Sequence, residues 1–120
     1  MSKGKQIALW VLTALLAFVF ISAGAFKLSG AQLAVDNFRK WGYPDWFRVA
    51  TGIIEVSGAL LLLVPRAAWL AAALLSCTMI GAAATHIHSG EFPNLPLPIV
   101  LLLLLIVLGW ARRPQLEPRR

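Results

Sequence analysis

Residues 7–26, IALWVLTALLAFVFISAGAF, form a run of twenty residues without a charge. About 20 apolar helical residues cross a bilayer core about 30 Å thick, so this run predicts a transmembrane helix. Residues 47–64, 67–85 and 95–111 are three further apolar stretches of similar length. We therefore expect an all-α fold: an integral membrane up-down four-helix bundle that forms one domain over residues 1–120.

The composition of the 120-residue chain agrees with a membrane protein. Hydrophobic residues make up 59% of the chain and charged residues 13%, whereas soluble domains have about 45–50% and about 25%. These values exclude a disordered chain and argue against an ordinary soluble enzyme. Cys77 is the single cysteine, so an intramolecular disulfide is excluded and a packing role is expected.

The distribution of positive charge predicts an orientation in the membrane. The chain has 11 Lys and Arg and 5 Asp and Glu, for a net charge of +6. Positively charged flanks stay in the cytoplasm, so we expect both termini on the cytoplasmic side of the inner (plasma) membrane, and no nucleic-acid partner. Seven positive residues support this side: Lys3, Lys5, Arg66, Arg112, Arg113, Arg119 and Arg120.

A cleavable signal peptide is the alternative for the first apolar run. Lys3 and Lys5 precede the run and the small residues Ala23-Gly24-Ala25 lie near its end, as in signal peptides. The apolar part of a signal peptide has about 7–15 residues, however, and this run is longer. The length favours a retained helix.

The segment between the first two predicted spans has a helical pattern of its own. Ala34, Phe38 and Trp41 recur at helical spacing, and Gly42-Tyr43-Pro44 follows as a helix end. This pattern predicts a short amphipathic helix on the membrane surface, with its aromatic side chains at the headgroup level. Both a plain anchoring segment and a lid over a site are compatible with it.

Glu55 is the ionisable residue expected to lie deepest in the membrane. It lies about nine residues into the second span, roughly 13 Å below the outer interface at 1.5 Å per residue. A carboxylate at this depth faces the interior of a bundle or a wet cavity. Lys27 and His86 end the first and third spans on the same side, so the three residues form a candidate polar pocket. The structural alternatives are an ion pair or a neutral, hydrogen-bonded carboxylic acid for Glu55, whose charge state the sequence leaves open, an interfacial anchor for Lys27 and a helix-end polar residue for His86.

The residues around His86 do not predict a metal site. His86 and His88 are two positions apart and therefore lie on different faces of a helix, unlike the i, i+4 histidines of helical metal sites. Glu91 would join them only if the chain were extended there. The sequence also contains no phosphate-binding loop, nucleophile elbow or cofactor motif.

Four short motifs resemble the DoxX-like branch of the DoxX/DoxD membrane proteins. They are residues 23–28 (AGAFKL), 41–44 (WGYP), 52–58 (GIIEVSG) and 81–86 (GAAATH). The resemblance covers residues from about 7 to 110 and implies a four-helix inner-membrane bundle. Members include a quinone-reducing thiosulfate oxidoreductase subunit, membrane parts of redox-stress complexes and helpers of other membrane proteins. The family positions in this chain are Gly24, Lys27, Gly52, Glu55, Gly58 and His86.

Two functions are compatible with the resemblance and the polar residues. The first is a redox-associated membrane subunit that binds a quinone or another small lipophilic molecule in the outer-half polar pocket. The second is a non-catalytic assembly or helper protein in which the polar residues, with Gly24, Gly52 and Gly58, only fix helix packing. The bilayer is the expected surrounding, other membrane or redox proteins are the expected partners, and the sequence leaves catalysis and oligomeric state open.

Overall fold

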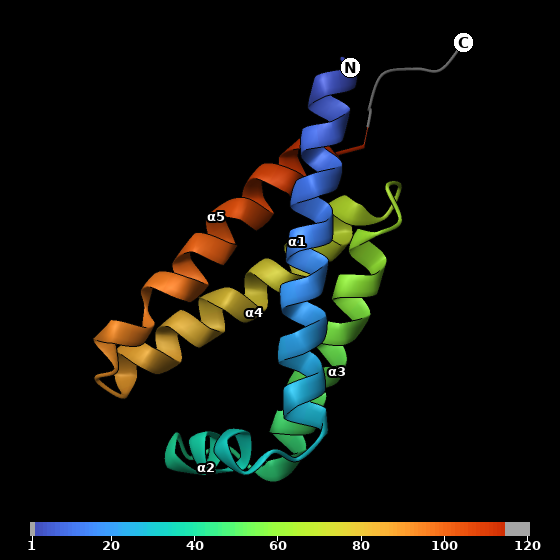
Figure 1. The fold of residues 1–120 in the computed structure, drawn as a ribbon. Helices are drawn as coiled ribbons and strands as arrows, with labels where there is room; N and C mark the ends of the chain where they lie inside the picture. Colours follow the sequence, from blue (N-terminus) through green and yellow to red (C-terminus); the bar gives the residue numbers. More distant parts are fainter. Residues whose placement is uncertain (1, 115–120) are drawn as a thin grey trace.

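All regular secondary structure in residues 2–114, which the computed structural model describes, is helical (Figure 1). The all-α expectation is confirmed, while Arg119 and Arg120 lie outside the described residues. The helices are α1 (Lys3–Leu28), α2 (Gln32–Lys40), α3 (Asp45–Leu62), α4 (Ala68–His88), the 3-10 helix η1 (Phe92–Asn94) and α5 (Pro96–Ala111).

Three helical segments are long and apolar enough to cross a membrane: Lys3–Leu28, Ala68–His88 and Phe92–Ala111. The third of these segments comprises η1 and α5. Helix α3 is 18 residues long but carries Asp45, Arg48 and Glu55, and it is not one of the three. The expected fourth span therefore lies in a helix whose composition alone does not identify it.

The long helices form two antiparallel pairs, α1 with α3 and α4 with α5. Figure 1 shows the α4–α5 pair inclined to the α1–α3 pair, with α2 lying across the far end of the latter. The beginning of α1 and the end of α5 meet, because the Arg112 guanidinium carbon lies 5.4 Å from the centre of the Trp10 ring. Successive long helices consequently run in alternating directions.

The α1–α3 contact depends on two glycines that lie face to face. A Cβ atom added to Gly24 would lie 2.7 Å from the carbonyl oxygen of Gly52 and 2.6 Å from Val56 Cγ2. A Cβ atom on Gly52 would lie 3.0 Å from the carbonyl oxygen of Gly24. Small residues allow helix backbones to approach this closely, and the sequence pattern predicted that both lie on one face of their helices.

The core lies between the pairs, and the outer surface is apolar. Gly58 of α3 packs on Leu75 of α4, where an added Cβ would lie 2.8 Å from Leu75 Cδ2. Leu16, Phe20 and Leu105 are fully buried nearby. Large apolar side chains also point outward, such as Phe18, which is 71% exposed. An apolar outer surface of this kind suits a lipid environment.

Candidate functional site

A cavity of about 530 Å³ lies between the two helix pairs, beside their packed core. Its walls come from α1, α3, α4 and α5, and aromatic residues of α2 and the following segment lie at its end. The apolar part of the wall includes Val19, Ile54, Leu74, Met79 and Leu101. A cavity with an apolar wall and a few polar groups is typical of sites for small molecules.

Lys27 and Glu55 form an ion pair in the cavity wall. The distance from Lys27 Nζ to Glu55 Oε1 is 2.8 Å, and the two side chains are 19% and 4% exposed. Glu55 points inward because it shares a helix face with Gly52 and Gly58, which pack on neighbouring helices. Lys27 follows Gly24 by three residues, so the α1–α3 crossing brings the two side chains together.

The contact between Lys27 and Glu55 is short without being a directional hydrogen bond. The ammonium nitrogen lies 2.8 Å from Oε1, yet this buried oxygen accepts no hydrogen bond of normal geometry from the described residues. We therefore treat the pair as a charge contact that leaves hydrogen-bonding capacity on the carboxylate. Arg48 strengthens the same junction by donating from Nη1 to the carbonyl oxygen of Lys27.

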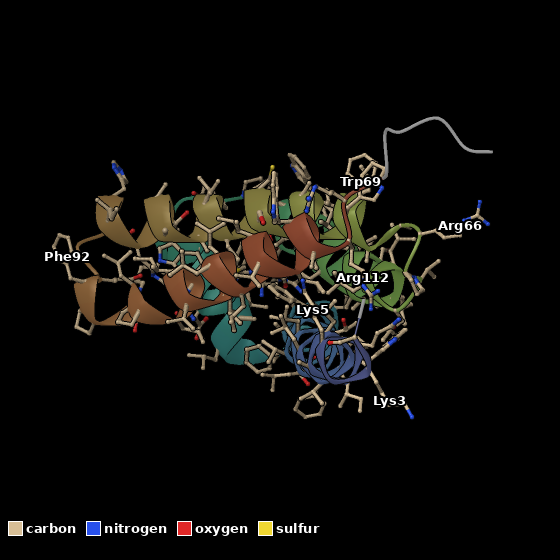
Figure 2. All side chains as sticks on the ribbon, turned by 90° about the horizontal axis from the view of Figure 1, so that it is seen from above. Lys3, Lys5, Arg66, Trp69, Phe92 and Arg112 are labelled. Atoms are coloured by element: carbon tan, nitrogen blue, oxygen red, sulfur yellow. The ribbon has the colours of Figure 1, made fainter. Side chains whose placement is uncertain are left out.

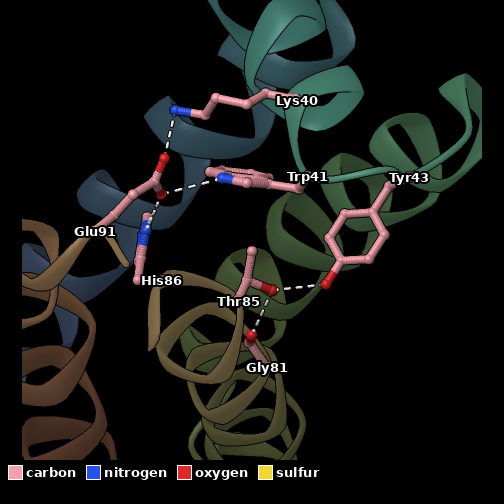
Figure 3. A network of polar contacts seen from close by, with 7 residues as sticks. All are labelled: Lys40, Trp41, Tyr43, Gly81, Thr85, His86 and Glu91. Carbon is pink, nitrogen blue, oxygen red and sulfur yellow. Dashed lines mark hydrogen bonds and ion pairs between the residues drawn. The ribbon is translucent and has the colours of Figure 1, made fainter. Parts of the chain in front are cut away.

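A second polar group, here called the rim network, consists of Lys40, Trp41, His86 and Glu91 (Figure 3). Glu91 Oε1 accepts a hydrogen bond from Trp41 Nε1 at 3.0 Å and lies 2.8 Å from His86 Nδ1. Its other oxygen pairs with the Lys40 ammonium. The hydrogen bonds from Lys40, His86 and Trp41 lower the pKa of Glu91 to about 2, with the Lys40 contact the largest cause.

Two glycine-terminated helix ends place the rim network. Gly90 has φ +71°, and the N–H of Glu91 donates to the carbonyl oxygen of His86 at 2.8 Å, which folds Glu91 back over His86. Gly42 has φ +85° and ends α2 in the same way, with the N–H of Tyr43 donating to Phe38 at 2.9 Å. Both glycines adopt a backbone conformation that other residues rarely take.

A second link across the cavity mouth joins Tyr43 to Thr85, with 2.7 Å between the two hydroxyl oxygens (Figure 3). Thr85 Oγ1 also donates to the carbonyl oxygen of Gly81 at 2.8 Å. Because a hydroxyl has one proton, Tyr43 is the donor in this bond when Thr85 donates to Gly81. The segment after α2 is thus tied to the end of α4 at two points.

The structure brings the predicted pocket residues together only in part. Lys27 and Glu55 are in contact, whereas His86 lines the same cavity but pairs with Glu91. Gly90, two residues after His88, was the sequence signal for this pairing. A helix that ends at a glycine of positive φ brings the residue after that glycine, here Glu91, back beside its last turn. Cys77, which we expected in the packed interior, lines the cavity and is exposed.

Comparison with known proteins gives a family but no described activity. The sequence profile of the DoxX-like family matches residues 11–108. The uncharacterized protein YdgD of Bacillus subtilis (strain 168) is 40% identical over 45 residues, which are 38% of this chain. That match spans only 40% of the relative's length. No solved structure matches the chain.

The family match includes every residue of the cavity wall, from Val19 to Leu101. Together with the three helical segments that are long and apolar enough to cross a bilayer, it indicates a membrane protein. The chain belongs to the DoxX-like family.

Proposed function

We propose that the chain is an inner-membrane protein with four transmembrane helices, and that its cavity binds the polar head of a small lipophilic molecule, with a quinone as the first candidate. The observation that carries the proposal is the cavity of about 530 Å³, whose apolar wall contains one ion pair. Such a site accommodates the apolar part of a ligand and binds its polar end.

The ion pair also supports α3 as the fourth span. At 1.5 Å per residue its 18 residues reach about 27 Å, close to the thickness of the hydrocarbon core. Glu55 is the charge in its middle, and contact with Lys27 offsets that charge within the protein. Asp45 and Arg48 lie in the first turn, where they meet the interface.

The charge distribution of the folded chain supports a cytoplasmic location for the beginning of α1 and the end of α5. This end carries five positive residues and, among residues 2–114, no acidic one: Lys3, Lys5, Arg66 and Arg112, which Figure 2 labels, and Arg113. The opposite half of the described chain has four positive residues and four acids, with Glu55 the one that lies in the middle of α3: Lys27, Arg39, Lys40 and Arg48 with Asp36, Asp45, Glu55 and Glu91. By the positive-inside rule, this distribution supports a location of the rim network in the outer half.

Ligand binding is tested with purified protein in lipid nanodiscs and a decyl-substituted benzoquinone as the probe. We compare Ala82→Trp with Ala84→Trp, because Ala82 lines the cavity and Ala84 is exposed on the same helix. Filling the cavity is expected to weaken binding at least about tenfold, which corresponds to about 1.4 kcal/mol. Equal binding by both variants would mean that the probe binds elsewhere, and the proposal would fail.

The assembly or helper function is the alternative, and the backbone contact between Gly24 and Gly52 favours it. In this alternative the ion pair only aligns α1 with α3. Glu55→Gln would then change stability or the capture of partner proteins, and neither the wild type nor the variant would bind the probe.

A further inference from the structure

In the structure, the threonine hydroxyls of the cavity wall donate their protons within the protein. Thr51, Thr78 and Thr85 each donate to a carbonyl oxygen of their own helix, at 2.7–2.8 Å. A hydroxyl carries one proton and two lone pairs, so each can now only accept a hydrogen bond.

In the rim, Tyr43 and Trp41 have also used their protons, and so has His86 in its neutral form. Tyr43 donates to Thr85, and Trp41 Nε1 donates to Glu91. His86 Nδ1 lies 2.8 Å from the same Glu91 oxygen, which as a carboxylate accepts and does not donate. When His86 is neutral, its other ring nitrogen is therefore an acceptor.

Glu55 adds the strongest acceptor of the wall. Its side chain is 4% exposed, and Oε1 is buried without a hydrogen-bond partner despite the charge contact with Lys27. A buried acceptor without a donor is unfavourable, and a hydrogen bond to a charged group is stronger than one between neutral groups. Lys27 is the strong donor in the described wall, since the Cys77 thiol is a weak one.

We propose that the ligand of this cavity carries a hydroxyl group on its head, as a quinol or another lipophilic phenol does. The hydroxyl donates to Glu55 and its oxygen accepts from Lys27. A quinone head has only carbonyl acceptors, so it would use Lys27 but leave Glu55 without a donor. This inference rests on the proposed binding function and specifies which chemical class the site prefers.

The test compares three probes that differ only in the head group: a decyl-substituted benzoquinone, its quinol and the dimethyl ether of that quinol. Binding to wild-type protein in nanodiscs is measured under argon, so that the quinol is not oxidised. We expect the quinol to bind at least about tenfold more tightly than the other two, given the strength of hydrogen bonds to charged groups.

Glu55→Gln is the first variant, because it replaces an acceptor-only carboxylate with an amide that also donates. We expect the preference for the quinol to fall to about threefold or less, since a hydrogen bond to a neutral acceptor is weaker. Ala84→Trp, on the outer face of α4, is the control and keeps the full preference.

A second measurement uses the wild-type protein, so that the test does not depend on whether the Glu55→Gln variant folds normally. In protein labelled with ¹³C at the glutamate carboxyl groups, infrared difference spectra should show a carboxylate shift on addition of quinol and none on addition of the ether. The shift should persist in Glu91→Gln. Equal binding of quinol and quinone, or no carboxylate shift, would overturn the donor inference while leaving the binding site intact. No binding of any probe would overturn the proposed function as well.

Discussion

The helices around the cavity are joined in two different ways. Helices α1 and α3 meet backbone to backbone at Gly24 and Gly52. The segment after α2 reaches α4 through polar side chains, at the rim network and at the contact between Tyr43 and Thr85. The first contact depends on volume and the second on charge and hydrogen bonding, so different changes should disrupt them.

The two kinds of contact should therefore have different roles: the α1–α3 contact holds the fold together, and the rim contacts close the end of the cavity. A close backbone contact cannot open without loss of the helix pair, because every atom at the crossing loses its neighbours at once. Side-chain contacts at the rim can be exchanged for water while the helices stay packed. We therefore expect the α1–α3 crossing to control stability and the rim to control access to the cavity.

The largest expected effect comes from adding one carbon atom at the α1–α3 crossing. Gly24→Ala should destabilise the protein by about 3 kcal/mol, because the new methyl group would overlap the carbonyl oxygen of Gly52 and force the helices apart. The free energy of unfolding in mixed detergent micelles measures the effect.

The matched control for that variant is Gly81→Ala in α4, where an added Cβ meets nothing within 4 Å. Alanine is the better helix former, so this variant should be unchanged or more stable by up to about 1 kcal/mol. A similar loss of stability in both variants would contradict the backbone contact.

The next effect concerns the two halves of the ion pair. Lys27→Met should cost about 2 kcal/mol, because it leaves the Glu55 carboxylate buried without a partner, and the partial exposure of Lys27 reduces the loss. Glu55→Gln should cost less, since a lysine near a helix end can extend toward water. Unfolding measurements on both variants check the order, and equal losses would indicate that Glu55 reaches solvent.

A smaller effect on stability is expected at the rim. Glu91→Gln should cost less stability than either variant of the ion pair, since its contacts lie at a solvent-accessible end and are screened there. Hydrogen exchange of residues 38–43 should nevertheless become several-fold faster, because the ion pair with Lys40 is lost and only the bond between Tyr43 and Thr85 still ties this segment firmly to the end of α4. Asp45→Asn, which removes only the exposed contact with Arg39, is the control and should leave this exchange rate unchanged.

The smallest expected effect is the pH dependence of the rim. The pKa of Glu91 falls from 4.5 to about 2 in the folded protein. A lowered carboxyl pKa means that the stabilisation is complete above about pH 4.5 and is lost as the pH falls toward 2. The stability difference between wild type and Glu91→Gln should follow this course. A constant difference down to pH 2 would show that Glu91 is not held as a carboxylate.

Much of the scaffold was predictable from residue spacing. The apolar runs placed four long helices, and the α2 pattern placed the short one, to within a few residues. The inward orientation of Glu55 also followed from its spacing relative to Gly52 and Gly58, because helical periodicity is a local property. The sequence left open whether Lys27 would reach Glu55 or extend outward, since both directions suit its long side chain.

The rim network was not predictable from the same spacing. Lys40 and Glu91 are fifty-one residues apart, and nothing in either local pattern indicates the other. The helix-ending glycines at Gly42 and Gly90 give the direction of each chain end, but the distance between those ends depends on how the two helix pairs are inclined. That inclination is set by side-chain packing at several crossings at once.

The sequence by itself determined the all-helical class, the apolar surface and the inward orientation of Glu55. Each of these depends on residues within a few helical turns of one another. Only the tertiary structure decided that a cavity lies between the helix pairs, that His86 pairs with Glu91, and that the threonine hydroxyls of the wall donate within the protein. These features depend on the packing of residues far apart in the chain. The local sequence pattern is compatible with several such arrangements, and side-chain volume and hydrogen-bond geometry select one of them.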